Sequence, residues 1–285
     1  MIYVVASVIC SVLVSVLLKL ARRAEIDIGQ AVAWNYVVAS VLTALVFEPS
    51  LAPLHQPGAP WFALIGLGAL LPTIFLALGA SVRHAGIVRS DAAQRLSLLL
   101  SLLAAFALFG EPLNAMKALG CALGLFALCG MVWRADRGEA TQGAARWGYP
   151  LLVFAGFGII DIMFKRVAAA GVPLGTSLQV MFALSLVVAV AIQLWRRARG
   201  QTHFTLSSLF GGVVLGLFNF GNIVFYLRGH RALPQHPALV FASMNLGVVV
   251  LGALVGVLVF RERLSRVNLV GLLLALLAIG LLTRS

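Results

Sequence analysis

Apolar runs of roughly 20 residues follow one another along the chain, and each is long enough to cross a bilayer core as a helix. Hydrophobic residues make up 61% of the 285 residues and charged residues only 11%. A soluble domain has about twice that charged share, so a single soluble core could not bury this much apolar surface. We therefore expect a polytopic membrane protein with no soluble catalytic domain.

Backbone groups in lipid must bond to one another, which leaves helices or closed barrels. Barrel strands alternate apolar and polar residues with period two, whereas these runs are apolar on all sides. The expected fold class is an all-α membrane protein with ten transmembrane helices. Their ranges are 2–21, 29–47, 61–82, 88–109, 113–133, 147–167, 173–195, 208–227, 236–260 and 265–283.

The net charge is +12, which in a soluble protein would suggest nucleic acid as a partner. Here most basic residues stand in short connectors between the apolar runs, where Lys and Arg set the orientation in the membrane. The expected partners are the lipid bilayer and a small-molecule substrate, without nucleic acid, metal or cofactor. We expect a monomer in the cell inner membrane.

Two copies of one motif divide the chain. Residues 109–120 read FGEPLNAMKALG and residues 260–271 read FRERLSRVNLVG, with Phe, Glu, Leu and Gly at the same spacing. LLKLARR at 17–23 similarly matches MFKRVAA at 163–169. The expected organisation is a first five-helix repeat over 1–135, a connecting loop over 136–146 and a second repeat over 147–285.

A repeat of five helices has odd parity, so its second copy enters the membrane inverted. The connector between the second and third helices holds no Lys or Arg, but its counterpart holds Arg196, Arg197 and Arg199. Such a difference is expected when matching connectors face opposite sides. Basic residues favour the connectors after odd-numbered helices, which predicts that both termini lie outside the cytoplasm.

With these features the sequence resembles the EamA type of the drug/metabolite transporter superfamily. The resemblance rests on the ten spans, the duplicated unit, the links FGEPL (109–113) and FRERL (260–264), and Lys19 and Lys165 near the ends of matching helices. The second link departs from the pattern at Arg263, where the first has Pro112. The resemblance implies a secondary transporter, often an exporter, of metabolites or drugs, and it implies cytoplasmic termini, contrary to the charge count.

Polar residues inside spans are costly and so mark transport paths or helix contacts. Transporters built from inverted repeats place the substrate near the bilayer midplane, between the repeats. Gln94 and Asn245 stand at matching positions, 17 residues before Glu111 and Glu262. The candidate substrate-binding residues are Ser7, Ser11, Gln94, Asn219, Asn222, Tyr226 and Asn245, and the predicted cavity lies among the first, third, fourth, sixth, eighth and ninth helices.

Two ionisable pairs stand four residues apart within helices: Asp91 with Arg95, and Asp161 with Lys165. Each can neutralise itself, which lowers the cost of burial. Alternatively, Asp161 carries the proton that drives transport, because desolvation raises the pKa of a carboxyl group. The serines, too, can instead bond their own backbone.

Pro72 should kink the third helix. Gly211, Gly212, Gly216 and Gly221 should loosen the eighth, and Gly252 with Gly256 predicts a closely packed face on the ninth. A lipid or lipid-carrier flippase of the same superfamily is the main alternative function. A membrane enzyme or a channel is less favoured, because no metal cluster, nucleophile motif or filter-like segment stands out.

Overall fold

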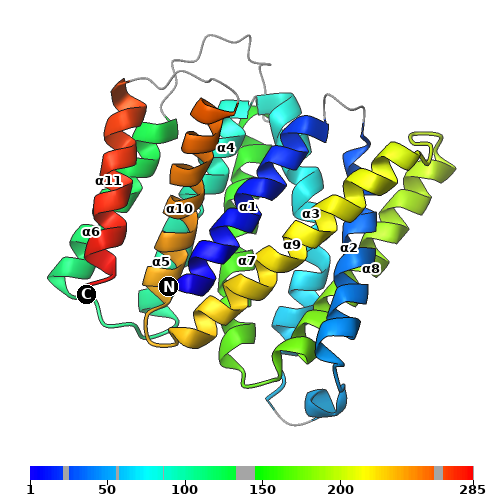
Figure 1. The fold of residues 1–285 in the computed structure, drawn as a ribbon, viewed down its shortest axis with the longest axis horizontal. Coiled ribbons are helices and arrows are strands. Elements are labelled where there is room, and N and C mark those ends of the chain that lie inside the picture. The colour runs from blue at the N-terminus through cyan, green and yellow to red at the C-terminus, as the bar shows by residue number, and fades with distance from the viewer. Residues whose placement is uncertain (22–25, 56–57, 86, 133–144, 260–265, 285) are drawn as a thin grey trace. The chain divides into compact units, whose positions relative to one another are not determined.

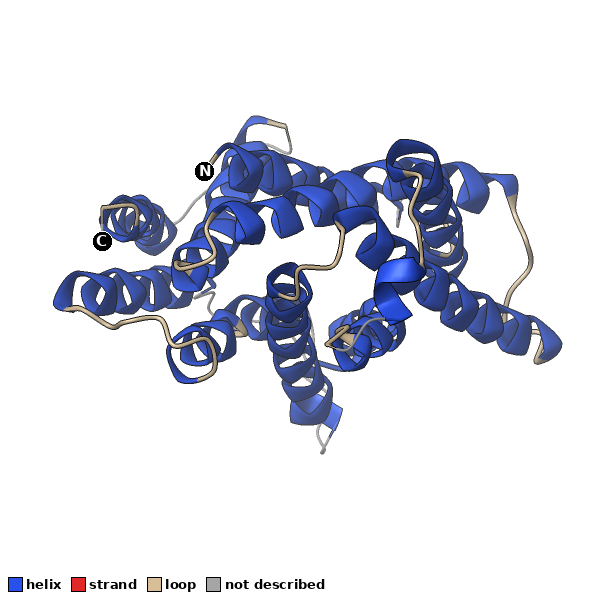
Figure 2. Ribbon diagram, turned by 90° about the horizontal axis from the view of Figure 1, so that it is seen from below, coloured by secondary structure: helices blue, strands red, loops and turns tan. Residues whose placement is uncertain are grey.

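A computed structural model describes residues 1–21, 26–55, 58–85, 87–132, 145–259 and 266–284. The described residues form α-helices and one 3₁₀-helix, and they contain no strand (Figure 2). The helices are α1 (Ile2–Ala21), α2 (Ile28–Phe47), η1 (Ala52–His55), α3 (Trp61–Ala85), α4 (Ile87–Leu96), α5 (Leu98–Ala107), α6 (Ala115–Val132), α7 (Ala145–Ala169), α8 (Leu174–Ala198), α9 (Leu206–Ala232), α10 (Pro237–Leu258) and α11 (Arg266–Leu282). The expected all-α fold class is confirmed.

Five described segments are long and apolar enough to cross a membrane: α2, Trp61–Ser81 of α3, α8, α9 and α10. Shorter apolar helical stretches cover Ile2–Leu18, Ala93–Ala107, Ala115–Ala127 and Leu269–Leu282. The chain is therefore a multi-pass membrane protein. Ten crossings and an inverted relation between the halves remain predictions, and the second link, 260–264, lies outside the described residues, as does most of the loop 136–146.

The fourth expected helix, 88–109, is wrong as a single helix, because the structure divides it at Ser97 into α4 and α5. The Ser97 hydroxyl donates to the Gln94 carbonyl at 2.6 Å. A serine side chain that bonds to nearby backbone in this way competes with the helical hydrogen bonds and bends a helix. Interrupted helices are also a common device in transporter cores.

The chain folds into two compact units. Unit 1 contains Met1–Val8, Ala77–Ile162 and Ala232–Ser285, and unit 2 contains Ile9–Leu76 and Met163–Arg231. Each unit therefore takes segments from both halves of the sequence. Helices α1, α3 and α7 contribute residues to both units, as does α9 through its last residue, Ala232.

Unit 1 is built around the packing of α6 against α11, which lie side by side in Figure 1 in green and red. Glycines on α6 permit this approach: a Cβ on Gly120 would stand 2.8 Å from Leu282, and one on Gly124 would stand 3.2 Å from Leu246 of α10. Helix α10 also packs against α5 and α11.

Unit 2 is built around α2 and α8, drawn in blue and yellow-green in Figure 1. Aromatic rings fill part of its core, with the Phe182 ring 6.4 Å from that of Tyr36 and 6.3 Å from that of Phe220, measured between centroids. Helix α9 approaches α2 closely, because a Cβ on Gly216 would lie 2.7 Å from the Val38 Cβ and 3.0 Å from the Asn35 carbonyl oxygen.

Candidate functional site

The candidate site residues divide between the two units. Unit 1 holds Ser7, Gln94, Arg95, Asp161 and Asn245, and unit 2 holds Ser11, Lys165, Asn219, Asn222 and Tyr226. The side chain of Asp91 lies outside the described residues, so its pairing with Arg95 stays a prediction. The pairing of Asp161 with Lys165 also stays a prediction.

In unit 1, the half-buried Asp161 side chain of α7 accepts a hydrogen bond from the Ser101 hydroxyl of α5 at 2.9 Å. The two helices approach closely one turn earlier, where a Cβ on Gly158 would stand 2.7 Å from Leu100. Ser101 itself is fully buried. This hydrogen bond joins α7 to α5 at the level of Asp161.

Gln94 and Asn245, the matching amides, are both half-buried and lie on α4 and α10. The Asn245 amide donates to the Phe241 carbonyl of its own helix at 3.1 Å, which uses one of its two donor hydrogens. Ser7, in the part of α1 that belongs to unit 1, is fully buried. Ser11, one turn later on the same helix, belongs to unit 2 and is half-buried. The Ser11 carbonyl accepts from the Ser15 hydroxyl at 3.1 Å, so Ser15 does bond its own helix.

In unit 2, a polar cluster forms where α7 meets α9. The Tyr226 ring meets Phe164 edge-on at 5.7 Å and His230 at 4.8 Å between centroids. Lys165, next to Phe164 in α7, is only 4% exposed. Burial of a basic side chain is costly, and in membrane proteins such residues often mark functional positions.

Asn219 and Asn222 precede Tyr226 on α9 by about two turns and one turn respectively, which places all three on one face of the helix. Asn219 and Tyr226 are buried, and Asn222 is half-buried. This face therefore extends the polar cluster along α9.

Sequence reasoning missed a second polar network in unit 2. Asp27 caps the N-terminus of α2 by accepting from the Gln30 N–H at 3.1 Å. Arg196, near the end of α8, donates from its two guanidinium NH₂ groups to the two carboxylate oxygens of Asp27 at 2.9 and 3.0 Å. The Thr202 hydroxyl donates to Asp27 at 2.9 Å, and the Asp27 N–H donates to the Ser208 hydroxyl of α9 at 3.0 Å.

The pKa of Asp27 reflects opposing effects. Burial raises the pKa, but hydrogen bonds from Arg196, Gln30 and Thr202 and the charge of Arg196 lower it, and the net result lies below the usual value. Asp27 followed three residues later by Gln30 is a helix-start signature that the sequence does contain. Its partner Arg196 stands 169 residues away, and no local pattern could have identified it.

Glu111, in the link between α5 and α6, connects to another helix. One of its carboxylate oxygens accepts from the Ala238 N–H at the start of α10 at 2.7 Å, and the other lies 3.1 Å from the Lys117 ammonium. His236, the residue before α10, makes no side-chain cap. Glu111 therefore satisfies a helix-end donor that would otherwise lack an acceptor.

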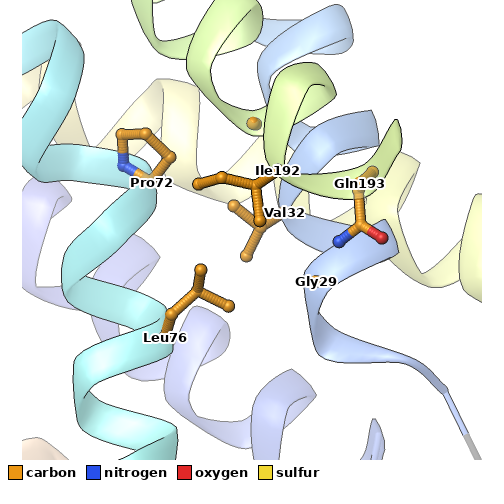
Figure 3. A pocket seen from close by; sticks show the side chains of 7 residues that line it. Gly29, Val32, Pro72, Leu76, Ile192 and Gln193 are labelled. Atoms are coloured by element: carbon orange, nitrogen blue, oxygen red, sulfur yellow. The ribbon is translucent and has the colours of Figure 1, made fainter. Parts of the chain in front are cut away.

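A small cleft opens in unit 2 between α2, α3 and α8 (Figure 3). It is narrow, with room for about one water molecule. Pro72, the residue expected to kink the third helix, lies inside α3 and forms part of one wall. The lining residues are Gly29, Val32, Pro72, Leu76, Ala189, Ile192 and Gln193.

Gly252 and Gly256 were expected to form a closely packed face on the ninth predicted span, which is α10 in the structure. A Cβ on Gly252 would meet no atom of the described chain within 4 Å, so the prediction of close packing is wrong there. Close approach occurs instead on α9, where a Cβ on Gly212 would stand 2.8 Å from the Ala31 carbonyl oxygen. Among the described residues, no group of three His, Cys, Asp or Glu could hold a metal ion.

Comparison with known proteins gives three findings. The model of the EamA-like transporter family matches residues 1–133. An uncharacterized protein of Haemophilus influenzae is 40% identical over 280 residues, which are 96% of this chain and 94% of that protein. A crystal structure with 17% sequence identity covers 99% of this chain and 98% of its own, with a TM-score of 0.70, and this likeness shows a shared fold.

Proposed function

The chain belongs to the EamA-like transporter family, and on that premise we propose that it is a secondary transporter that exports a small metabolite or drug by alternating access. The observation that carries this proposal is the burial of Lys165 in α7, where it is only 4% exposed and follows Phe164, whose ring packs edge-on against Tyr226 of α9. Burying a polar group among apolar helices costs free energy, so such residues occur mainly where they bind a substrate or a coupling ion. The substrate then contacts the α9 face formed by Asn219, Asn222 and Tyr226.

The remaining candidates, Ser7, Ser11, Gln94 and Asn245, complete the proposed substrate path. Asp161 carries the coupling proton in this scheme. The transporter works as a monomer in the inner membrane.

Contacts between helix ends support ten crossings. With ten spans, connectors that follow odd-numbered spans share one side of the membrane, and those that follow even-numbered spans share the other. In each of three pairs, the two partners lie in or beside connectors of the same parity. The pairs are Asp27–Arg196, Ser50–Thr176 and Glu111–Ala238.

The test is solute-driven proton movement in proteoliposomes with a pH dye trapped inside. Amino acids, sugars and ethidium are added in turn to vesicles that hold wild type, Asp161→Asn or Asp161→Glu. We expect at least one compound to dissipate an imposed pH gradient in wild type, much less in Asp161→Asn, and partly again in Asp161→Glu. Proton movement that is unchanged in Asp161→Asn would refute the coupling role.

The same vesicles test the flippase alternative. Fluorescent lipid in both leaflets is quenched from outside with dithionite. A transporter of soluble compounds leaves half of the label protected, whereas full quenching only in vesicles with protein would overturn the proposal.

A further inference from the structure

We propose that the groove between α1, α2 and α9 in unit 2 holds an acyl chain of an anionic phospholipid, whose phosphate group lies beside Arg197 and Arg199. The lipid is retained at this site and is not the compound that is transported. The inference therefore goes beyond transport, and its test does not require that the transported substrate be known.

The groove has a buried floor and an open side. It lies at the end of α1 and near the starts of α2 and α9, which Figure 1 draws in dark blue, blue and yellow. Ala31 and Leu215 form the floor, since both are buried, and the half-buried Leu17 packs against them. Leu20 also lines the groove and is 41% exposed. The groove is therefore open to the surroundings of these helices, which in a membrane protein are lipid.

The size and lining of the groove suit a hydrocarbon chain. The described residues that line it are all Leu, Ile, Ala or Gly. It has room for roughly six to nine water-sized groups, and a methylene group is of similar size. Water finds no hydrogen-bond partners in an apolar space, so such a cavity stays dry. An acyl chain instead regains the dispersion contacts that an empty groove lacks.

The last turn of α8 lies beside one end of the groove. Its Arg196 donates two hydrogen bonds to Asp27, at 2.9 and 3.0 Å. Asp27 stands between Ile26 and Ile28 in the sequence, and both isoleucines line the groove. The residues that directly follow Arg196 therefore lie at this end of the groove.

The connector from α8 to α9 is fixed at the same place. The side-chain amide of Gln30 donates to the Thr202 hydroxyl at 2.8 Å, and its oxygen accepts from the Thr205 N–H at 3.2 Å. Gln30 directly precedes Ala31, a residue of the groove floor. The start of α2 thus holds this connector, including Phe204, next to the groove.

Two arginines at this end carry the charge that an anionic lipid needs. The Arg197 guanidinium lies 5.2 Å from the centroid of the Phe204 ring. That of Arg199 lies 4.5 Å from the centroid of the exposed Trp195 ring. Both arginines are exposed, and neither forms an ion pair with a carboxylate of the described residues. Basic residues and Trp are typical of the headgroup level of a bilayer, where Arg binds phosphate through charge-assisted hydrogen bonds.

The charge balance favours an anionic headgroup over a neutral one. Asp27 is the only carboxylate that the structure describes at this end of unit 2, and Arg196 neutralises it. Arg197 and Arg199 thus leave a net positive charge beside the groove. Each basic residue at a membrane surface strengthens the binding of anionic lipid by about fivefold. A phospholipid with a net negative charge therefore complements both the groove and the arginines.

The test counts the lipids that stay bound to the purified full chain in native mass spectrometry. Phosphatidylglycerol is compared with phosphatidylcholine of the same acyl chains, and with dihexanoyl phosphatidylglycerol, which has the same headgroup on short chains. We expect saturable binding of a single long-chain phosphatidylglycerol and much weaker binding of the other two lipids. Equal binding of either of them, or no saturable binding at all, would overturn the proposal.

Leu20→Trp fills the open side of the groove and should abolish this binding. Leu217→Trp is the matched control, because Leu217 is a leucine of unit 2 with similar exposure, 48% against 41%, that does not line the groove. Leu17→Phe narrows the groove from α1 and decides the question should Leu20→Trp fail to fold. Equal binding in the groove variants and in Leu217→Trp would mean that lipid only surrounds the protein, and the proposal would be wrong.

Arg197→Gln and Arg199→Gln should each weaken the binding of phosphatidylglycerol by about fivefold and leave that of phosphatidylcholine unchanged. Arg166→Gln is the control, because Arg166 is exposed near the end of α7, shortly before α8 begins, whereas Arg197 lies where α8 ends. An equal loss in Arg166→Gln would reveal a general effect of net charge and would overturn the placement of the headgroup.

Discussion

Arg196 binds Asp27 through two parallel hydrogen bonds, which join the last turn of α8 to the N-cap of α2. The side chains are each 24% exposed, so the pair is screened by water only in part. Planar two-bond contact between a guanidinium and a carboxylate is the strongest form of ion pair that side chains make. It fixes the relative position of the two central helices of unit 2.

Asp27→Asn should lower the free energy of unfolding by about 1–3 kcal/mol, because it removes the charge-assisted bonds to Arg196, while an Asn can still cap α2. Denaturation in mild detergent measures this. Glu48→Gln is the control, since Glu48 is an exposed acid at the other end of the same helix. An equal loss in both variants would contradict the prediction.

The same pair predicts how stability depends on pH. The folded-state pKa of Asp27 is lowered, so its contribution is complete above the unfolded-state value of about 4 and is lost as pH falls through the lower folded-state value. The unfolding temperature of wild type should therefore fall in this acidic range more steeply than that of Asp27→Asn. Parallel curves for the two proteins would show that Asp27 adds nothing to the acid response.

Glu111→Leu should destabilise unit 1 by about 3–5 kcal/mol, because it leaves the buried Lys117 ammonium and the Ala238 N–H without their acceptor. Lys117→Met should also destabilise, whereas the double variant should recover most of the loss due to the stranded charge. A double-mutant cycle measures the interaction energy between Glu111 and Lys117. Additive losses would mean that the ion pair contributes no energy of its own.

Gly216→Ala should cost about 1–3 kcal/mol, because the new methyl group would stand 2.7 Å from the Val38 Cβ and would force α9 away from α2. Gly252→Ala is the matched control: no described atom lies within 4 Å of the new methyl group, and alanine favours a helix over glycine. Unfolding midpoints of both variants provide the comparison. A loss in Gly252→Ala as large as in Gly216→Ala would contradict this account.

A reporter fused to the C-terminus tests orientation. The distribution of Lys and Arg predicts that alkaline phosphatase, which is active outside the cytoplasm, gives the signal. A cytoplasmic signal from a green fluorescent fusion, with phosphatase silent, would refute the orientation and agree with what the family resemblance implies.

The positions of the helices could be predicted because apolar runs are a local property of sequence. The break at Ser97 could not, because the apolar pattern continues through it and only one serine hydroxyl, bonded to the Gln94 carbonyl, marks it. The glycine contacts were assigned to the wrong helix for a related reason. A small-residue motif shows that a helix can pack closely, but it does not show which helix lies next to it. At Gly212 the neighbour is Ala31 of α2.

The candidate site was predictable in part. Lys165 and Tyr226 stood out as polar residues in apolar runs, and the structure buries both, with Tyr226 packed against Phe164, the residue before Lys165. Asp27 and Arg196 did not stand out, since each lies where charged residues are ordinary, at the end of a span. Their importance comes from a pairing across the chain, which periodicity cannot reveal.

The composition of unit 2 from residues 9–76 and 163–231 bears on how the protein is made. When α2 leaves the ribosome, the residues that will cover Asn35 and Tyr36 have not yet been translated. Arg196 follows Asp27 by 169 residues, a delay of roughly 10 to 30 s at common rates of synthesis. During that interval the buried side chains of α2 lack the helices that will enclose them, so α2 reaches its final environment only after α8 and α9 have been made.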